Sequence, residues 1–222
     1  MDNTTDDRLI LRLELGAMGT NCYLLADDGE IAIIDPGFEP ERVLSAVARL
    51  AARPGKPPRA VKYIINTHGH IDHMGADAEI KQATGALILI GHADARQLTD
   101  SQANLSVFLG AETVSPPADR LLREGDTVEV GETVMKVYET PGHTEGGICL
   151  IGDGFAFTGD TLFFDSMGRT DFPGGSERKI KASLQRLVEL LPDDTMLYPG
   201  HNEPGLMRDA KGVNIFLDFS RW

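Results

Sequence analysis

The sequence predicts an α/β fold in which two β-sheets pack against each other and helices cover their outer faces. Two observations support this prediction. A strand-rich segment is followed by a section in which helices and strands alternate, and the same order then occurs a second time. The length of 222 residues and the hydrophobic content of 41% suit one large layered domain, which we expect to span residues 1–222.

The first half of the chain has the hydrophobic periodicity of strands, then of a helix, and then of strands and helices in alternation. Strands are predicted over residues 8–15, 21–26, 31–34, 61–65 and 86–90. A helix is predicted over residues 40–53, where apolar residues recur at helical spacing after Pro40. A second helix is predicted over residues 72–84, ended by Gly85.

The second half repeats this order after a region, residues 92–115, in which we expect short helical pieces. Strands are predicted over residues 127–130, 133–140, 147–151, 154–158 and 195–198. Ser176 is a suitable N-cap for a helix with an apolar stripe at helical spacing. From residue 203 onward the pattern is ambiguous, and no element is predicted there.

Residues 67–73, with the sequence Thr-His-Gly-His-Ile-Asp-His, place three imidazoles and a carboxylate within six positions. These side chains are good ligands for divalent cations such as zinc. His68, His70 and Asp72 follow one another at intervals of two residues, whereas neighbours on a helix face are three or four residues apart. The run therefore predicts a loop that leaves a strand and surrounds metal, with ligands for more than one ion.

Further metal-binding side chains follow other predicted strands. His143, Asp160 and His201 each lie at a junction between a strand and a loop, beside glycine residues. Loops at strand ends commonly carry catalytic groups on a rigid scaffold, and glycine allows the backbone to approach an ion closely. These positions indicate a metalloenzyme.

Composition excludes several other classes of function. The net charge of −13 argues against nucleic acid as a partner, because phosphate binding needs a clustered basic surface. The longest apolar run, residues 86–90, is too short to span a bilayer, and the polar, acidic residues 1–7 do not form a secretory signal. Cys22 and Cys149 lie in separate apolar runs and are expected to be buried. We therefore expect a cytoplasmic protein without membrane or nucleic-acid partners.

The chain resembles the metallo-β-lactamase-fold hydrolases, and within them the glyoxalase II group of hydroxyacylglutathione hydrolases. The matching segments occur in the order of that family and extend from residue 19 to residue 201. They are GTNCY at 19–23, DPG at 35–37, THGHIDH at 67–73, PGHT at 141–144, GDT at 159–161, GRTDFPGG at 168–175 and PGH at 199–201. The resemblance implies an αββα sandwich of two mixed sheets with metals at one edge.

The resemblance also implies a division of the ligands between two divalent ions. The first ion would be bound by His68, His70 and His143, and the second by Asp72, His73 and His201. Asp160 would bridge them, because a carboxylate has two oxygens. Zinc is the first choice for such a site, and iron and manganese are also compatible with it. For Asp35, a turn residue and a support for the metal ligands are equally good interpretations.

In glyoxalase II-like enzymes this arrangement implies cleavage of thioesters such as S-2-hydroxyacylglutathione by a metal-bound hydroxide. Asp72 would assist catalysis at the leaving group. Arg169 matches a basic residue near the glutathione part of the substrate, but it is equally well interpreted as a structural partner of Asp171 or Asp165. Phe163 and Phe164 would line the same pocket or belong to the core.

The resemblance leaves the substrate open. Full-length glyoxalase II enzymes carry a C-terminal helical domain with further basic residues, which this chain is expected to lack, and residues 202–207 differ from the usual ending of shorter relatives. Three alternatives therefore stand beside the thioesterase. They are an iron-dependent glutathione persulfide dioxygenase using His68, His143 and Asp160, a lactonase or β-lactamase, and a non-enzymatic metal-binding domain on the same fold.

Overall fold

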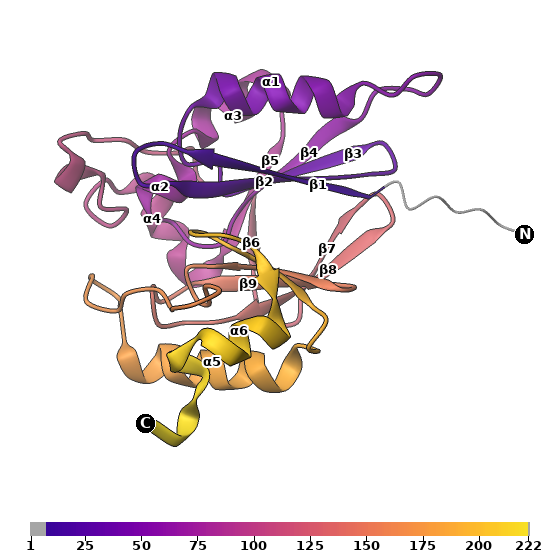
Figure 1. Cartoon of the computed structure of the whole chain (residues 1–222). Helices are drawn as coiled ribbons and strands as arrows, with labels where there is room; N and C mark the ends of the chain where they lie inside the picture. The colour runs from indigo at the N-terminus through magenta and orange to yellow at the C-terminus, as the bar shows by residue number, and fades with distance from the viewer. Residues whose placement is uncertain (1–7, 222) are drawn as a thin grey trace, which may run out of the picture.

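The computed structural model describes residues 8–221, so the expectation for residues 1–7 falls outside the described residues. It contains two six-stranded mixed sheets that pack face to face, with helices on both outer surfaces (Figure 1). The predicted αββα sandwich is confirmed. In Figure 1, α1 and α3 cover the upper sheet, while α5 and α6 cover the lower one.

The first sheet has the strand order β1-β2-β3-β4-β5-β6. Its strands are β1 (Leu9–Leu15), β2 (Thr20–Asp27), β3 (Glu30–Ile34), β4 (Ala60–Asn66), β5 (Leu87–Gly91) and β6 (Arg120–Leu122). The pairs β1/β2 and β2/β3 are antiparallel, whereas β3 to β6 run parallel. The parallel connections need crossovers, which the helices between these strands provide.

The second sheet has the order β12-β11-β10-β9-β8-β7. Its strands are β7 (Thr127–Val130), β8 (Thr133–Glu139), β9 (Ile148–Gly152), β10 (Phe155–Gly159), β11 (Met196–Pro199) and β12 (Gly205–Leu206). Only β10 and β11 pair in parallel, and α5 connects them. The helices of the molecule are α1 (Pro40–Ala51), α2 (Ile71–Met74), α3 (Asp77–Thr84), α4 (Ala95–Thr99), α5 (Glu177–Leu190) and α6 (Met207–Val213).

The core follows from the alternation of side chains along each strand. On β2, Tyr23 and Leu25 point into the layer between the sheets, while Cys22 and Leu24 point toward the helices of the first sheet. Both faces of this strand are therefore buried, which explains why its whole length is apolar or hydrogen-bonded. A third apolar cluster lies between the second sheet and helices α5 and α6. Both cysteines are buried, as expected.

The helix predicted over residues 72–84 is wrong as one continuous element, because it is divided into α2 and α3 at Gly75 and Ala76. The Ala76 N–H donates to Pro36 O, 2.9 Å away, instead of continuing the helix. A Cβ at Gly75 would lie 2.4 Å from Gly37 O. The break thus results from close packing against the loop at residues 35–37, a contact that local sequence does not reveal.

The remaining elements were only partly foreseen. The region 92–115 contains α4 and the short 3₁₀ helices η1 (His92–Asp94) and η2 (Ser106–Leu109), in agreement with the expected helical pieces. The short strands β6 and β12 and helix α6 were not predicted; two further 3₁₀ turns follow, η3 (Ile215–Leu217) and η4 (Phe219–Arg221). Within residues 8–221, none of the helices has the length and apolar character needed to cross a bilayer.

Candidate metal centre

The seven predicted metal ligands meet at one edge of the sandwich. The first sheet supplies four of them from the segment that follows β4 and includes α2. The second sheet supplies the others from three separate loops, which follow β8, β10 and β11. All seven except His201 are buried; the set is His68, His70, Asp72, His73, His143, Asp160 and His201.

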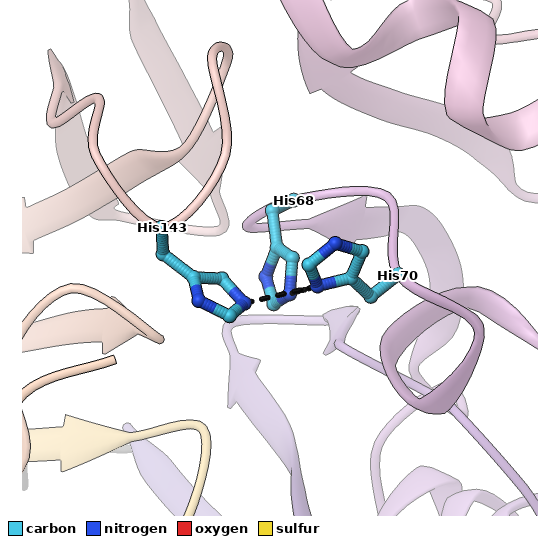
Figure 2. Close-up of side chains that lie close together, drawn as sticks. All are labelled: His68, His70 and His143. Carbon is cyan, nitrogen blue, oxygen red and sulfur yellow. Dashed lines mark hydrogen bonds between the residues drawn. The ribbon is translucent and has the colours of Figure 1, made fainter. Parts of the chain in front are cut away.

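The first group of ligands consists of His68, His70 and His143, whose ligand atoms lie within 4.8 Å of one another. His70 Nδ1 lies 3.1 Å from His68 Nε2 and 2.9 Å from His143 Nε2. Figure 2 shows the three rings directed toward a common point, with His143 reaching it from the opposite loop. Three ring nitrogens that converge in this way form a site for one cation.

The second group consists of Asp72, His73 and His201, again with ligand atoms within 4.8 Å of one another. Asp72 Oδ2 lies 3.2 Å from His201 Nε2 and 3.4 Å from His73 Nε2. Gly200 lets this group form, because a Cβ there would lie 2.7 Å from the His73 ring and 2.2 Å from Asp160 Oδ1.

Asp160 lies between the two groups. Its Oδ2 is 3.5 Å from His143 Nε2 and 3.5 Å from His201 Nε2, and its Oδ1 is 3.4 Å from His73 Nε2. One carboxylate therefore contacts histidines of both groups. This is the geometry that a bridging ligand requires.

Hydrogen bonds on the far side of the rings orient the ligand nitrogens. His143 Nδ1–H donates to Arg169 O at 2.7 Å, because a carbonyl only accepts, and this leaves Nε2 free to bind a cation. His73 Nδ1 lies 3.0 Å from Asp35 Oδ2, an ion-pair contact on the side of the ring opposite Nε2. Asp35 also accepts from Thr67 N and Oγ1, both at 2.7 Å. Asp35 thus contacts both the histidine-rich loop and the candidate ligand His73, in addition to its place in a turn.

The protonation states of His68, His70 and Asp72 suit cation binding, whereas at His73 and His201 the neighbouring carboxylates outweigh the effect of burial and raise the pKa. Burial and the neighbouring His143 lower the pKa of His70 to about 3, so this imidazole is neutral. Burial and the surrounding histidines also hold the pKa of His68 well below its usual range. Burial alone would raise the pKa of Asp72, but His73 and a hydrogen bond from His201 hold it well below its usual value. Neutral imidazoles and ionised carboxylates are the forms that bind metal.

Unsatisfied atoms provide an independent test of the metal assignment. Among the described residues, His73 Nε2 and Asp160 Oδ1 are buried without a hydrogen-bond partner. Such atoms are costly to bury unless something else compensates them, and a cation between them would do so. The donors therefore fit two divalent ions. A set of imidazoles and carboxylates accommodates zinc, iron or manganese.

Sequence reasoning missed residues of β2 that hold Asp72 and the His201 loop. Thr20 Oγ1 donates to Asp72 Oδ2 at 3.0 Å. Asn21 Nδ2 donates to Pro199 O and Asn202 O, and Tyr23 Oη donates to Pro199 O at 2.7 Å. The resemblance includes residues 19–23 as a matching segment but assigns these three side chains no role. The segment joins the first sheet to the loop of the second.

A second missed set holds the other loops. Asp94 is buried and accepts from Thr144 Oγ1 at 2.6 Å and from Gly146 N at 2.7 Å, which fixes the loop carrying His143. Gln97 Oε1 accepts from Gly69 N at 2.9 Å between the first two histidines of the run. These residues carry no local signal, because their partners are distant or are backbone groups.

The predicted substrate residues are placed differently from one another. Arg169 and Phe163 line a cavity of about 510 Å³ at the metal ligands, whereas Phe164 lines a neighbouring cavity and packs against the outer core of the second sheet. The Arg169 guanidinium donates to both oxygens of Asp171, at 2.7 and 2.6 Å. A substrate contact by any of the three stays a prediction.

Comparison with known proteins agrees with this geometry. The chain is 32% identical to the hydroxyacylglutathione hydrolase GloC of Haemophilus influenzae, with 91% of this chain and 94% of that protein covered. Its structure is similar to the B3 metallo-β-lactamase BLEG-1, with a TM-score of 0.86, 29% identity and coverage of 94% and 99%. It is also similar to TTHA1623 in a di-iron-bound form, with a TM-score of 0.78, 32% identity and coverage of 93% and 100%.

The match to a protein family covers nearly all of the fold. Residues 15–201 match the Metallo-beta-lactamase superfamily, and this range begins at the end of β1 and ends at His201. All seven candidate ligands fall inside it. The chain therefore belongs to the metallo-β-lactamase superfamily.

Proposed function

We propose that this protein is a dinuclear metal-dependent hydrolase that cleaves thioesters, with S-2-hydroxyacylglutathione as one member of the substrate class. The observation that carries the proposal is the position of Asp160 between the two ligand groups. The similarity to GloC, which is named a hydroxyacylglutathione hydrolase, supports the choice of a thioester. We expect a small-molecule substrate and a cytoplasmic location.

Two divalent ions in these groups would supply a water nucleophile of lowered pKa and polarise the acyl carbonyl. The hydrolysis forms a C–O bond to the acyl carbon and breaks its C–S bond, and the bonding electron pair leaves with sulfur. A carboxylic acid and a thiol result. Zinc is our first choice for both ions, with iron next in view of the similarity to a di-iron protein.

Asp72 has two tasks in this proposal. Its Oδ2 faces His73 and His201 and accepts from Thr20, which fixes the carboxylate at the second group. From there it would face the leaving group, while the proton lost by the attacking water balances the thiol product through solvent, because the low pKa of Asp72 makes it a poor proton acceptor. His143 would keep its orientation throughout, because its Nδ1–H is held by Arg169 O.

The test combines elemental analysis with a hydrolysis assay. Purified protein is expected to contain about two transition-metal ions per chain and to hydrolyse S-lactoylglutathione. Removing the metal with a chelator should abolish hydrolysis, and adding zinc or iron should restore it. Full activity in protein shown to be metal-free would contradict the proposal, as would inactivity of fully loaded protein toward every thioester.

A second candidate is hydrolysis of a β-lactam, favoured by the similarity to BLEG-1. The same ligand groups could serve an amide carbonyl, because the nucleophile and the polarising cations are the same. A chromogenic cephalosporin tests this candidate directly. A kcat/KM for the cephalosporin that exceeds the value for thioesters would replace our first choice. Iron content with glutathione-persulfide-dependent oxygen uptake would instead indicate a dioxygenase.

A further inference from the structure

We propose that the substrate carries an uncharged, apolar group, and that this group binds to an apolar rim formed by Met18, Leu105, Phe108 and Leu109. The inference rests on the proposed function and names the substrate class of the same site. All four residues line the cavity that also contains metal ligands such as His70 and Asp160. The rim is therefore within reach of any molecule whose reacting carbon lies at the metals.

The exposed apolar side chains of the rim do not contribute to the folded core. Phe108 is 76% exposed, Leu109 55% and Met18 41%. Folding leaves these side chains in water, although their burial would be favourable. Apolar side chains gathered at the mouth of a cavity mark a ligand-binding surface more often than isolated exposed ones do. An apolar ligand would cover them.

The rim is fixed to the metal centre by buried hydrogen bonds. Ile71 N, within the histidine-rich run, donates to Asn104 O at 2.9 Å. Asn104 is fully buried, donates to Thr113 O at 2.9 Å and accepts from Ser106 N at 2.9 Å. The segment that presents Phe108 and Leu109 is thus a defined part of the site.

Leu105 adds a further sign of specific placement. Its φ of +69° lies in the left-handed region, which is unfavourable for residues other than glycine. Its side chain is buried and lines the cavity. Strained backbone of this kind is retained where the surroundings demand it, and here the strain places an apolar side chain against the substrate space.

The guanidinium groups near the cavity are already paired with carboxylates. The positive charge of Arg169 is paired with both oxygens of Asp171, and its guanidinium stacks 4.0 Å from the centre of the Phe172 ring. At the neighbouring cavity, which Glu14 and Glu203 line, the Arg12 guanidinium donates to both of these carboxylates. The carboxylates of a glutathione thioester would have to compete with these side chains for a guanidinium, which limits what the glutathione part adds to binding. The apolar part of a thioester meets no such competition and suits the rim.

Binding of non-hydrolysable thioethers tests the inference without relying on turnover. Calorimetry on the metal-loaded protein would compare S-methyl- and S-hexyl-N-acetylcysteamine with S-hexylglutathione. The hexyl ligand of N-acetylcysteamine is expected to bind at least about tenfold more tightly than the methyl ligand, because several methylene groups leave water. S-Hexylglutathione is expected to bind no more tightly than its uncharged counterpart.

Variants assign the effect to the rim. In the double variant Phe108→Ser and Leu109→Ser, the ratio of hexyl to methyl affinity should fall to about twofold, whereas Phe108→Leu should keep most of it. The matched control is Val213→Ser with Ile215→Ser, since these side chains are 55% and 58% exposed and do not line the cavity. Thermal melts confirm that each variant is folded.

Several results would overturn the inference while leaving the proposed function intact. They are equal affinity for the hexyl and methyl ligands, tighter binding of the glutathione ligand, and an unchanged ratio in the rim variant. Failure of the proposed function is seen separately, as loaded protein that hydrolyses no thioester. Tight hexyl binding that depends on the rim supports the inference whichever reaction follows.

Discussion

The two sheets contribute to the metal centre in different ways. The first sheet supplies His68, His70, Asp72 and His73 from one continuous segment after β4. The second supplies His143, Asp160 and His201 from three loops that are distant in sequence. The first contribution is set by local sequence, whereas the second depends on how three strand ends are arranged. Damage to either half should therefore have different consequences.

The largest loss of activity is expected from a substitution in the continuous segment that follows β4. His70→Ala removes a ligand whose Nδ1 contacts both partners of the first group, so hydrolysis should fall by more than about a thousandfold and metal content from about two ions to one per chain. The control is His92→Ala, since His92 pairs with Glu139 and does not line the cavity. A His70→Ala variant with wild-type activity would refute the assignment.

A smaller loss of activity is expected from a substitution that adds only a methyl group beside the ligands of the second sheet. Gly200→Ala places a Cβ 2.2 Å from Asp160 Oδ1, so the bridging carboxylate must move. We expect kcat/KM to fall by about a hundredfold, since displacements near 1 Å have this cost. Gly212→Ala is the control, because a Cβ there meets nothing within 4 Å. Equal kinetics for the two variants would show that Asp160 tolerates displacement.

A still smaller effect, on metal affinity, is expected from a residue that does not face the metal site but holds the loop carrying His143. Asp94 accepts from the Thr144 hydroxyl and the Gly146 N–H through different oxygens, so Asp94→Asn replaces one acceptor by an NH2 group that can only donate. Metal affinity, measured by competition with a chromophoric chelator, should fall about tenfold. Asp27→Asn is a matched control, because Asp27 is buried and accepts from Thr133 and Glu132 at the other end of β2. If both variants lose affinity equally, the effect is general destabilisation.

The smallest effect is expected at Arg169. Its guanidinium is exposed and engaged with Asp171, so Arg169→Ala should change kcat/KM for S-lactoylglutathione by less than about threefold. Steady-state kinetics with this substrate provide the measurement. A loss above tenfold that appears in KM would make Arg169 a substrate contact and weaken the case for an uncharged substrate.

Much of the fold could be predicted because hydrophobic periodicity is a local signal. The strands of both halves and helices α1 and α5 were expected near their observed positions. The division of the 72–84 helix could not be predicted, because it depends on Gly75 meeting Gly37 from a distant loop. Strand β6 has only three residues, two of them exposed, so no alternation reveals it.

The metal centre shows the same limit. Its candidate ligands stand out in the sequence because histidine beside glycine is distinctive at strand ends. Thr20 and Asp94 do not stand out, since each acts on a residue about 50 positions away. For Arg169 the sequence is compatible with a substrate contact or with a structural ion pair. The structure contains the ion pair with Asp171, and the substrate contact stays a prediction.

The position of Asp160 between histidines of both sheets has a consequence for the lifetime of the folded protein. Ions held there would join the two halves of the sandwich, and the halves could not separate until the ions were released. Metal loading should therefore lower the rate at which the two sheets separate, even though the contacts within each sheet stay the same. In a cell, resistance to proteolysis would then report whether a given molecule had received its ions.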